Sequence, residues 1–343
     1  MAPAEFPLAL TLGDPAGIGP DVTLLAYAAR SQETIPPFVL LGNEAVLAQR
    51  ADALGLSVPI ATVSSAAEAL SVFDQALPLL PIDVPETVTA GRPTMAAMDA
   101  VKHSIETAVA LVQRWEARAV VTNPVSKAHL YEAGFAFPGH TEYLAALAGD
   151  GGETPLLPVM MLVAGPFKVV PTTIHIPLKD VPRTLTQDLL RATLEITDRD
   201  LRRFFGYEQP RLAVSGLNPH AGEDGSLGRE ELEIIAPVIE AARNAGLDVS
   251  GPYPADTLFH TAARERYDAA ICMYHDQALV PFKTLAFEEG VNVTLGLPFV
   301  RTSPDHGTAF DIAGSGAANP RSLIEALRLA EAMSESAARE TVS

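Results

Sequence analysis

The chain is poor in the residues that mark secreted proteins and nucleic-acid-binding proteins. It has one cysteine, Cys272, among 343 residues, so no disulfide can form within the chain. Its 24 lysines and arginines are outnumbered by 42 aspartates and glutamates, and the net charge of -18 repels phosphate backbones and anionic membrane surfaces. The composition therefore argues against nucleic acid and against a membrane as partners.

Long apolar runs and the standard dinucleotide-binding fingerprint are also missing. No uncharged run is long enough to span a bilayer, and the N-terminus lacks the basic start of a signal peptide, so we expect a soluble, cytoplasmic protein. No Gly-x-Gly-x-x-Gly follows an expected strand, and Gly314-x-Gly316-x-x-Asn319 only approaches that pattern. Any nicotinamide cofactor therefore has to bind in another way.

Short apolar runs alternate with helical patterns along the chain. A buried strand is expected at 7–12, a glycine-rich loop at 13–19, and a helix from Pro20, because proline is favoured at the first helical position. Further strand and helix pairs are expected at 38–41 with 44–54, 119–122 with 126–133 and 211–215 with 229–245, and the longest helices at 94–115 and 186–205. The alternation predicts an α/β fold with a largely parallel sheet, since strands that are apolar on both faces need helices over both.

Three histidines, His175, His220 and His275, each lie at or just beyond a short apolar run. Ligands of parallel α/β proteins gather beyond the carboxyl ends of the strands, so the three imidazoles can converge. Imidazole suits zinc, cobalt, iron or nickel, and three protein ligands leave one position for a substrate, as in catalytic metal sites. The alternative is that each histidine caps a loop or satisfies a buried backbone group.

Several polar and cationic residues suit a small anionic ligand: His140, Thr141, Lys283, Asn292 and Arg301. The first two begin an expected helix, whose N-terminal amide groups and dipole attract anions. An arginine can grip a carboxylate or a phosphate through two parallel hydrogen bonds. The alternative for each residue is a solvated side chain or a surface ion pair.

The segment 305–320 is rich in small and polar residues and leads into an expected helix at 321–333. Its glycines allow the backbone to approach a nucleotide closely. An ordinary irregular loop would have the same composition, so the segment alone leaves both interpretations open.

Six motifs taken together resemble one enzyme family. They are LGDPAGIGP at 12–20, PGHTE at 138–142, GLNPHAGE at 216–223, YHDQ at 274–277, RTSPDHGT at 301–308, and the remainder of the segment that ends at Pro320. This set resembles the 4-hydroxythreonine-4-phosphate dehydrogenase family, in the isocitrate and isopropylmalate dehydrogenase superfamily. The resemblance runs from about Leu8 to about Ala330, which is nearly the whole chain.

The resemblance implies a fold of two α/β/α domains, each with a largely parallel sheet, like isocitrate and isopropylmalate dehydrogenases. It also implies an active site in the cleft between the domains and a homodimer that shares a divalent metal across its interface. We expect the first domain, on the cofactor side, at 1–125 and 280–343. The second domain, on the metal and dimer side, is expected at 126–279.

Residue roles follow from matching the motifs position by position. The resemblance implies that the metal ligands are His175, His220 and His275, and that the substrate is contacted by His140, Thr141, Lys283, Asn292 and Arg301. We expect the cofactor to be bound by Gly13, Asp14, His306, Gly307, Asp311 and Asn319. The candidates for the catalytic base are Asp256, Asp276 and Lys283, with orientation of His275 as the other role open to Asp276.

The activity implied by the resemblance is an oxidation that depends on NAD or NADP and on zinc, magnesium or cobalt. The substrate would be 4-phosphooxy-L-threonine, and the product a 2-amino-3-oxo acid that decarboxylates to 3-amino-2-oxopropyl phosphate in pyridoxal phosphate biosynthesis. Related dehydrogenases of 4-phosphoerythronate or of a dihydrodiol share much of the pattern. Two rivals of other classes are a metal-dependent hydrolase of a phosphorylated metabolite and a non-catalytic binding protein for small phosphorylated acids.

Overall fold

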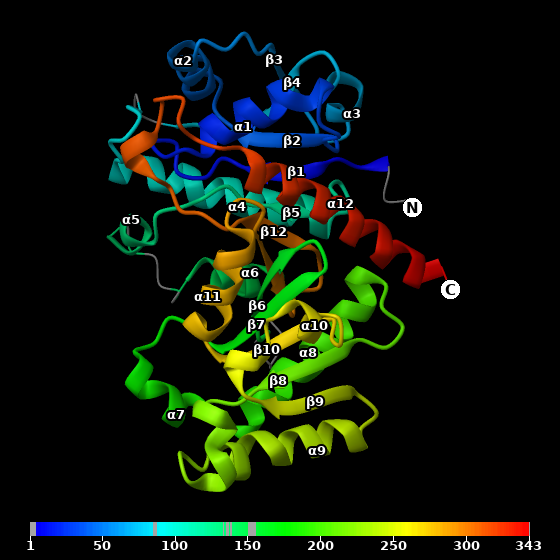
Figure 1. Ribbon diagram of the computed structural model, residues 1–343. Helices are drawn as coiled ribbons and strands as arrows, with labels where there is room; N and C mark the ends of the chain where they lie inside the picture. The colour runs from blue at the N-terminus through cyan, green and yellow to red at the C-terminus, as the bar shows by residue number, and fades with distance from the viewer. Residues whose placement is uncertain are drawn as a thin grey trace. The chain divides into compact units, whose positions relative to one another are not determined.

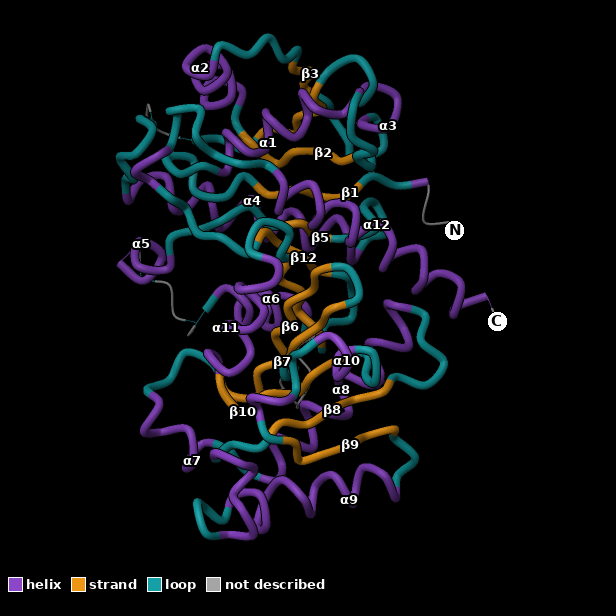
Figure 2. Tube along the Cα trace, in the orientation of Figure 1, coloured by secondary structure: helices purple, strands orange, loops and turns teal. Residues whose placement is uncertain are grey.

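The computed structural model describes residues 5–84, 88–132, 134, 137, 139–149 and 156–342. The chain divides into two compact units. Unit 1 comprises Met1–Pro158 and Leu297–Ser343, and unit 2 comprises Val159–Gly296. Both units are built from strands and helices in alternation, which confirms the predicted α/β class (Figures 1 and 2).

The strands of unit 1 are all parallel to their neighbours within the unit. Their spatial order is β3-β4-β2-β1-β5-β12, with β2 and β1 in the middle. Their bounds are β1 Leu8–Thr11, β2 Phe38–Gly42, β3 Ile60–Thr62, β4 Leu77–Pro81, β5 Val120–Val121 and β12 Arg301–Pro304. Every residue of β1 and β2 is buried, as expected for parallel strands that are covered on both faces.

Most helices expected in unit 1 lie close to their expected bounds. The helix expected at 321–333 instead continues to Val342, which makes it longer than the two helices expected to be the longest, and the short helix at 69–72 was not expected. The bounds of the helices in unit 1 are α1 Gly19–Ala28, α2 Glu44–Leu54, α3 Ala69–Val72, α4 Met98–Gln113, α5 Lys127–Glu132, α6 His140–Ala148 and α12 Arg321–Val342. At α2 the side chain of Asn43 accepts a hydrogen bond from the Val46 amide, and Gly55 ends the helix with a left-handed φ of 64°. These two residues are the usual capping signals at the two ends of a helix.

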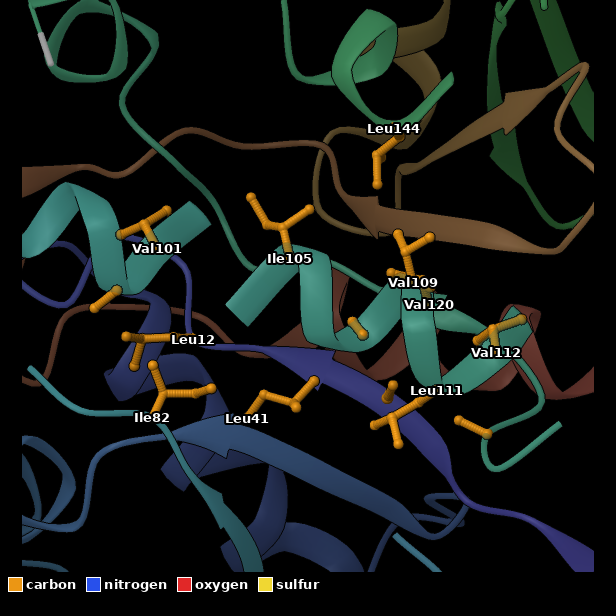
Figure 3. Packing of buried hydrophobic residues seen from close by; sticks show 14 of the residues in the cluster. Leu12, Leu41, Ile82, Val101, Ile105, Val109, Leu111, Val112, Val120 and Leu144 are labelled. Atoms are coloured by element: carbon orange, nitrogen blue, oxygen red, sulfur yellow. The ribbon is translucent and has the colours of Figure 1, made fainter. Parts of the chain in front are cut away.

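The core of unit 1 surrounds α4. Leu12 and Leu41 lie on one side of this helix, and Leu144 of α6 lies on the other (Figure 3). All three side chains are at most 2% exposed. Burial of a leucine side chain stabilises a fold by roughly 1.5–3 kcal/mol, so α6 is held firmly within this unit.

Unit 2 combines antiparallel and parallel strands in the order β11-β6-β7-β10-β8-β9. The pairs β11 with β6 and β6 with β7 are antiparallel, and the remaining pairs are parallel. Their bounds are β6 Val159–Ala164, β7 Phe167–Thr173, β8 Arg211–Ser215, β9 Asp248–Tyr253, β10 Ala269–Tyr274 and β11 Val291–Leu295.

Of the helices in unit 2, those expected at 186–205 and 229–245 are observed, the second with a correction, and those at 181–184, 261–264 and 275–286 were not expected. The bounds of the helices in unit 2 are α7 Val181–Thr184, α8 Gln187–Phe205, α9 Ala236–Asn244, α10 Thr261–Arg264 and α11 His275–Ala286. The single helix expected at 229–245 instead begins with a π-helical turn, Glu231–Ile235, before α9. Pro237 has no backbone N–H to donate to the preceding turn, which gives a physical reason for the interrupted hydrogen-bond ladder.

The borders between the units fall later in the chain than the expected positions at 125/126 and 279/280. Residues 126–158 belong to unit 1, because Tyr143 and Leu144 of α6 pack in its core. Residues 280–296 belong to unit 2, because Phe282 of α11 is fully buried against Phe167 of β7. Sequence composition shows no linker at either border, so the packing of α6 and α11 decides them.

None of the helices in the described part of the chain is long and apolar enough to cross a membrane.

Candidate active site

The three predicted metal ligands follow three neighbouring parallel strands of unit 2. In the order β7-β10-β8, His175 comes shortly after β7, His275 directly after β10, and His220 in the loop after β8. Carboxyl ends of parallel strands lie at one edge of a sheet. The expected position of all three histidines at strand ends is therefore confirmed.

Two of these histidines lie side by side. The ring centroids of His175 and His275 are 5.7 Å apart, with an angle of 44° between the ring planes. Both residues line a pocket with a cavity volume of about 310 Å³, whose other lining residues are Thr173, Ile176, Leu178, Val181, Tyr274 and Asp276. The pocket thus has an apolar wall and a polar end formed by imidazole and carboxylate groups.

The carboxylate of Asp276 lies beside one of the two ring nitrogens of His275. Its Oδ1 atom lies 2.8 Å from Nδ1 of His275. A hydrogen bond from Nδ1 to a carboxylate leaves Nε2 as the nitrogen for a metal, and such carboxylate–histidine pairs are common around metal ligands. This contact supports the orienting role for Asp276 rather than the role of base.

His220 is exposed in a loop of unusual backbone conformation. Its φ is 54°, and the residues up to Asp224 all have positive φ. Within the described residues, no group of three or more His, Cys, Asp or Glu side chains is close enough to hold a metal. The structure brings His175 and His275 together, and the participation of His220 stays a prediction.

The two remaining candidates for the base differ in their surroundings. Asp256 is exposed in a short 3-10 turn, Ala255–Thr257. Lys283 is half-buried on α11, with Nζ 5.2 Å from the centroid of the Phe287 ring. Both positions allow proton exchange with solvent, so the geometry leaves both candidates open.

The predicted substrate-binding residues are divided between the units. Asn292 is half-buried in β11 of unit 2, and Thr141 is half-buried near the start of α6 in unit 1. His140 is the first residue of α6, and Gly139 before it is extended; Pro138 of the same motif lies outside the described residues. The predicted helix start at this motif is confirmed.

Arg301 is the most deeply buried cation of the predicted site. It begins β12, its exposed fraction is 4%, and one of its Nη atoms donates a hydrogen bond to Oγ1 of Thr122 at 2.7 Å. Burial lowers the pKa of Arg301 to about 10, which still leaves the guanidinium charged at neutral pH. A charged guanidinium in such surroundings is well suited to a phosphate or carboxylate.

The glycine-rich loop after β1 packs tightly on the loop after β5. Gly13 has a φ of 69°, and a Cβ atom there would lie 2.6 Å from Cβ of Asn123. Asp14 is buried, and burial raises the pKa of its carboxyl group although Oδ1 accepts a hydrogen bond from the Ala16 amide. Its other oxygen, Oδ2, has no hydrogen-bond partner among the described residues. An unpartnered buried oxygen fits a hydroxyl or amide donor from a bound cofactor.

The segment 305–320 contacts this loop within unit 1. The Ile18 amide donates a hydrogen bond to the Thr308 carbonyl at 2.9 Å, and the Gly314 amide donates to Oδ1 of Asp21 at 2.7 Å. The predicted cofactor residues His306, Gly307 and Asp311 lie on the half-buried or exposed part of this segment. Asn319 has a structural explanation, because its Oδ1 accepts a hydrogen bond from the Arg321 amide at the start of α12.

Several buried polar residues position these loops but were not among the predicted site residues. They are Asp21, Arg50, Glu231 and Gln277, all at most 8% exposed. A charged residue in a helical pattern is ordinarily taken as part of the solvated face. Only the three-dimensional partners of these residues reveal their position.

Relatives in known protein families extend over nearly the whole chain. Residues 33–330 match the family model described as "Pyridoxal phosphate biosynthetic protein PdxA". The chain belongs to this family. The 4-hydroxythreonine-4-phosphate dehydrogenase of Methylorubrum extorquens is 56% identical over 332 residues, covering 96% of this chain and 95% of the relative. The family resemblance seen in the motifs is thereby confirmed.

Solved structures of related dehydrogenases have the same fold as this chain. The 4-hydroxythreonine-4-phosphate dehydrogenase of Klebsiella pneumoniae is 37% identical with a TM-score of 0.84, covering 96% of this chain and 99% of that chain. A terephthalate 1,2-cis-dihydrodiol dehydrogenase of Burkholderia xenovorans LB400 is 26% identical with a TM-score of 0.64, covering 95% and 98%. The mostly parallel α/β fold is thus shared with enzymes that are named for different substrates.

Proposed function

We propose that this chain oxidises 4-phosphooxy-L-threonine with NAD or NADP, as a 4-hydroxythreonine-4-phosphate dehydrogenase of pyridoxal phosphate biosynthesis. The observation that carries the proposal is its near-full-length similarity to relatives with that name. The paired histidines beside a pocket of unit 2 support it, since an oxidation of this kind needs a polar site next to a space for substrate.

A divalent metal, either zinc, magnesium or cobalt, is proposed to be held by His175, His220 and His275. The donor set fits such an ion: two imidazoles already lie 5.7 Å apart, and Asp276 engages Nδ1 of His275 and leaves Nε2 for coordination. When bound, the metal supplies a Lewis acid that lowers the pKa of the substrate hydroxyl.

A second copy of the chain is proposed to share the site in a homodimer. Unit 2 exposes large apolar side chains near the histidine pocket and along or just after α11, among them Leu178 at 67%, Val280 at 62% and Phe287 at 73%. Val280 and Phe287 are seven residues apart, so they lie on the same side of the helix. Covering these side chains with a second subunit would stabilise the dimer by removing apolar surface from water.

The residues proposed to hold the substrate are His140, Thr141, Lys283, Asn292 and Arg301. Arg301 is suited to an anionic group, because it is charged, buried and oriented by Thr122. The cofactor is proposed to lie against the loops that contain Gly13, Asp14, His306, Gly307 and Asp311, where the buried Oδ2 atom of Asp14 can accept one hydrogen bond.

The proposed reaction removes a hydride and a proton from the substrate. A base, Asp256 or Lys283, takes the proton of the C3 hydroxyl, while the hydrogen on C3 leaves as hydride to the nicotinamide ring. The product is a 2-amino-3-oxo acid. Loss of carbon dioxide from this β-keto acid, followed by protonation of the resulting enolate, gives 3-amino-2-oxopropyl phosphate.

One assay distinguishes the proposed substrate from its close analogues. The full-length protein is mixed with metal, NAD or NADP, and in turn 4-phosphooxy-L-threonine, 4-phosphoerythronate and a dihydrodiol, and the absorbance of the reduced nicotinamide is followed. The proposal expects kcat/KM to be highest for 4-phosphooxy-L-threonine. A higher value for the dihydrodiol would instead indicate the activity for which the Burkholderia xenovorans structure is named.

A metal-dependent hydrolase would use the same histidines with water as the nucleophile. It would release inorganic phosphate without reducing NAD, so measuring phosphate in the same mixture separates the two classes. A binding protein for phosphorylated acids would do neither. The packing of the segment 305–320 on the glycine-rich loop favours the dehydrogenase, since a hydrolase has no need of a cofactor site.

A further inference from the structure

The loops that carry the three histidines are tied together by buried side-chain hydrogen bonds. Oγ1 of Thr173, at the end of β7, donates to the carbonyl of Met273 in β10 at 2.7 Å. Oε1 of Gln277 accepts from the amide of the same Met273 at 2.7 Å, and Nε2 donates to the carbonyl of Gly216 after β8 at 2.8 Å. One glutamine side chain, 8% exposed, thus joins the strand end before His275 to the loop before His220.

Glu231 performs the same task for the loop after β8. Its exposed fraction is 3%, and its Oε1 accepts from the amides of Leu217 at 2.8 Å and Asn218 at 2.7 Å. Its Oε2 accepts from the Nδ2 atom of Asn218 at 2.9 Å. A carboxylate that accepts several N–H groups forms strong, charge-assisted hydrogen bonds, which fix the backbone on either side.

The backbone leaves almost no room around this carboxylate. A Cβ atom at Gly216 would lie 3.1 Å from Oε1 of Glu231, and one at Gly222 would lie 2.5 Å from Oε2. A Cβ atom at Gly216 would also lie 2.9 Å from Cα of Ala221, and Gly222 has a left-handed φ of 80°. Glycine is therefore favoured at both positions, and the loop lies close against the carboxylate.

The segment held in this way is strained. Between His220 and Asp224, four residues other than glycine have left-handed φ values: His220, Ala221, Glu223 and Asp224. Each such residue costs roughly 1–2 kcal/mol, so the conformation persists only where surrounding contacts impose it. Glu231 provides those contacts immediately before the strained run.

We propose that Glu231 and Gln277 are positioning residues that hold His220 and His275 in the arrangement needed to bind the divalent metal. The inference rests on the proposed metal site and adds two residues that touch neither substrate nor metal. Gln277 sets the spacing between the His275 and His220 loops, and Glu231 sets the direction in which the strained loop presents His220. Partners of this kind typically change metal affinity by about 10–100-fold when they are replaced.

Two conservative substitutions test the proposal without deleting the side chains. In Glu231→Gln, one amide oxygen can still accept from both backbone N–H groups, but the NH₂ group faces Nδ2 of Asn218, a donor facing a donor. In Gln277→Glu, the carboxylate keeps the bond from the Met273 amide but faces the Gly216 carbonyl, an acceptor facing an acceptor. Glu231→Ala, which removes all three bonds, completes a graded series.

Matched controls are available on neighbouring exposed positions. Glu233→Gln makes the same change two residues along, where the side chain pairs with Arg229 and is 59% exposed. Gln187→Glu removes a similar donor to a backbone carbonyl, that of Glu233, at an exposed site. Both controls lie in unit 2 and outside the proposed site.

The measurement is a calorimetric titration of cobalt(II) alone into the metal-stripped full-length protein, with the thermal unfolding midpoint recorded for each metal-free variant. We expect the dissociation constant for cobalt to rise about 10-fold or more for Glu231→Gln and for Gln277→Glu, further for Glu231→Ala, and less than about 2-fold for the controls. A folded variant with a lowered unfolding midpoint but unchanged cobalt affinity would show a purely structural role and overturn the inference. Absence of cobalt binding by the unsubstituted chain would instead overturn the metal site itself, so the two failures are distinguishable.

Discussion

Asp21 and Arg50 form a buried ion pair that joins three segments of unit 1. Arg50 also donates hydrogen bonds to the carbonyls of Gly17 and Pro15, and the second oxygen of Asp21 accepts from the Gly314 amide. Asp21 is 0% exposed and Arg50 is 4% exposed. The pair thereby connects the glycine-rich loop to the segment 305–320, the two parts of the proposed cofactor site.

Breaking this pair from one side should destabilise the protein strongly. Asp21→Asn or Arg50→Met leaves one buried charge without its partner, and we expect the free energy of unfolding to fall by about 3–5 kcal/mol. The double variant should lose less than the sum of the two single losses, because no charge is then left unpaired. Urea unfolding of the two single variants and the double variant measures these losses in free energy of unfolding. A loss in the double variant equal to the sum of the two single losses would contradict the coupling between Asp21 and Arg50. Because the pair joins the two loops of the proposed cofactor site, the KM for NAD should rise more than the KM for the substrate.

Replacing His220 tests whether this exposed residue completes the metal site. His220→Ala should reduce turnover by about 1000-fold or more, because a metal ligand contributes several kcal/mol to stabilising the transition state. The unfolding midpoint should change little, since the side chain is exposed. His260→Ala, at another exposed histidine of unit 2, is the control and should keep normal turnover. Unimpaired turnover by the His220 variant would remove this residue from the metal site.

Arg301 should act on substrate binding rather than on the cofactor. Arg301→Lys keeps the charge but loses the planar pair of donors, so we expect the KM for the phosphorylated substrate to rise by about 10-fold or more, with a much smaller change in the KM for NAD. Arg118→Lys is a suitable control, because the side chain of Arg118 is another mostly buried guanidinium of unit 1, paired with Glu331. Equal increases in both constants for the Arg301 variant would argue against a substrate role.

Asp14 should make stability depend on pH. Burial raises the pKa of its carboxyl group above the ordinary 3.8, so the folded state holds the proton more tightly than the unfolded state does. Stability from this group is therefore greatest in acid and falls as the pH rises from near 3.8 through the raised folded value. Asp14→Asn removes the titration, so the variant should gain stability relative to the unsubstituted chain as the pH is raised from about 4 to about 7. Urea unfolding at both pH values measures the difference in free energy of unfolding between the variant and the unsubstituted chain. The same difference at both pH values would contradict the prediction.

Helices and strands with a clear hydrophobic pattern were predictable from the sequence. The helix at 44–54 was expected at its observed bounds with Gly55 as the stop signal, and in the structure Asn43 caps its other end. The strand at 211–215 was likewise expected at the bounds of β8. The histidines were expected at strand ends, and the parallel neighbours β7, β10 and β8 place them there.

The features that depend on packing were not predictable. The domain borders are decided by where Leu144 and Phe282 are buried, and no change in composition marks either place. The left-handed run from His220 to Asp224 has one glycine in five residues, so local propensity argues against it. The backbone just before it, at Leu217 and Asn218, is hydrogen-bonded to Glu231, a residue that a helical sequence pattern assigns to a solvated helix face.

The most direct test of the proposed function is metal-dependent reduction of NAD by the full-length protein with 4-phosphooxy-L-threonine. The protein is first stripped with a chelator, and cobalt, zinc or magnesium is then restored while the absorbance of reduced nicotinamide is followed. We expect no reduction after stripping, recovery on adding at least one of these metals, and no recovery in His220→Ala. Full activity of the stripped enzyme, or full recovery in that variant, would refute a metal held by the three histidines.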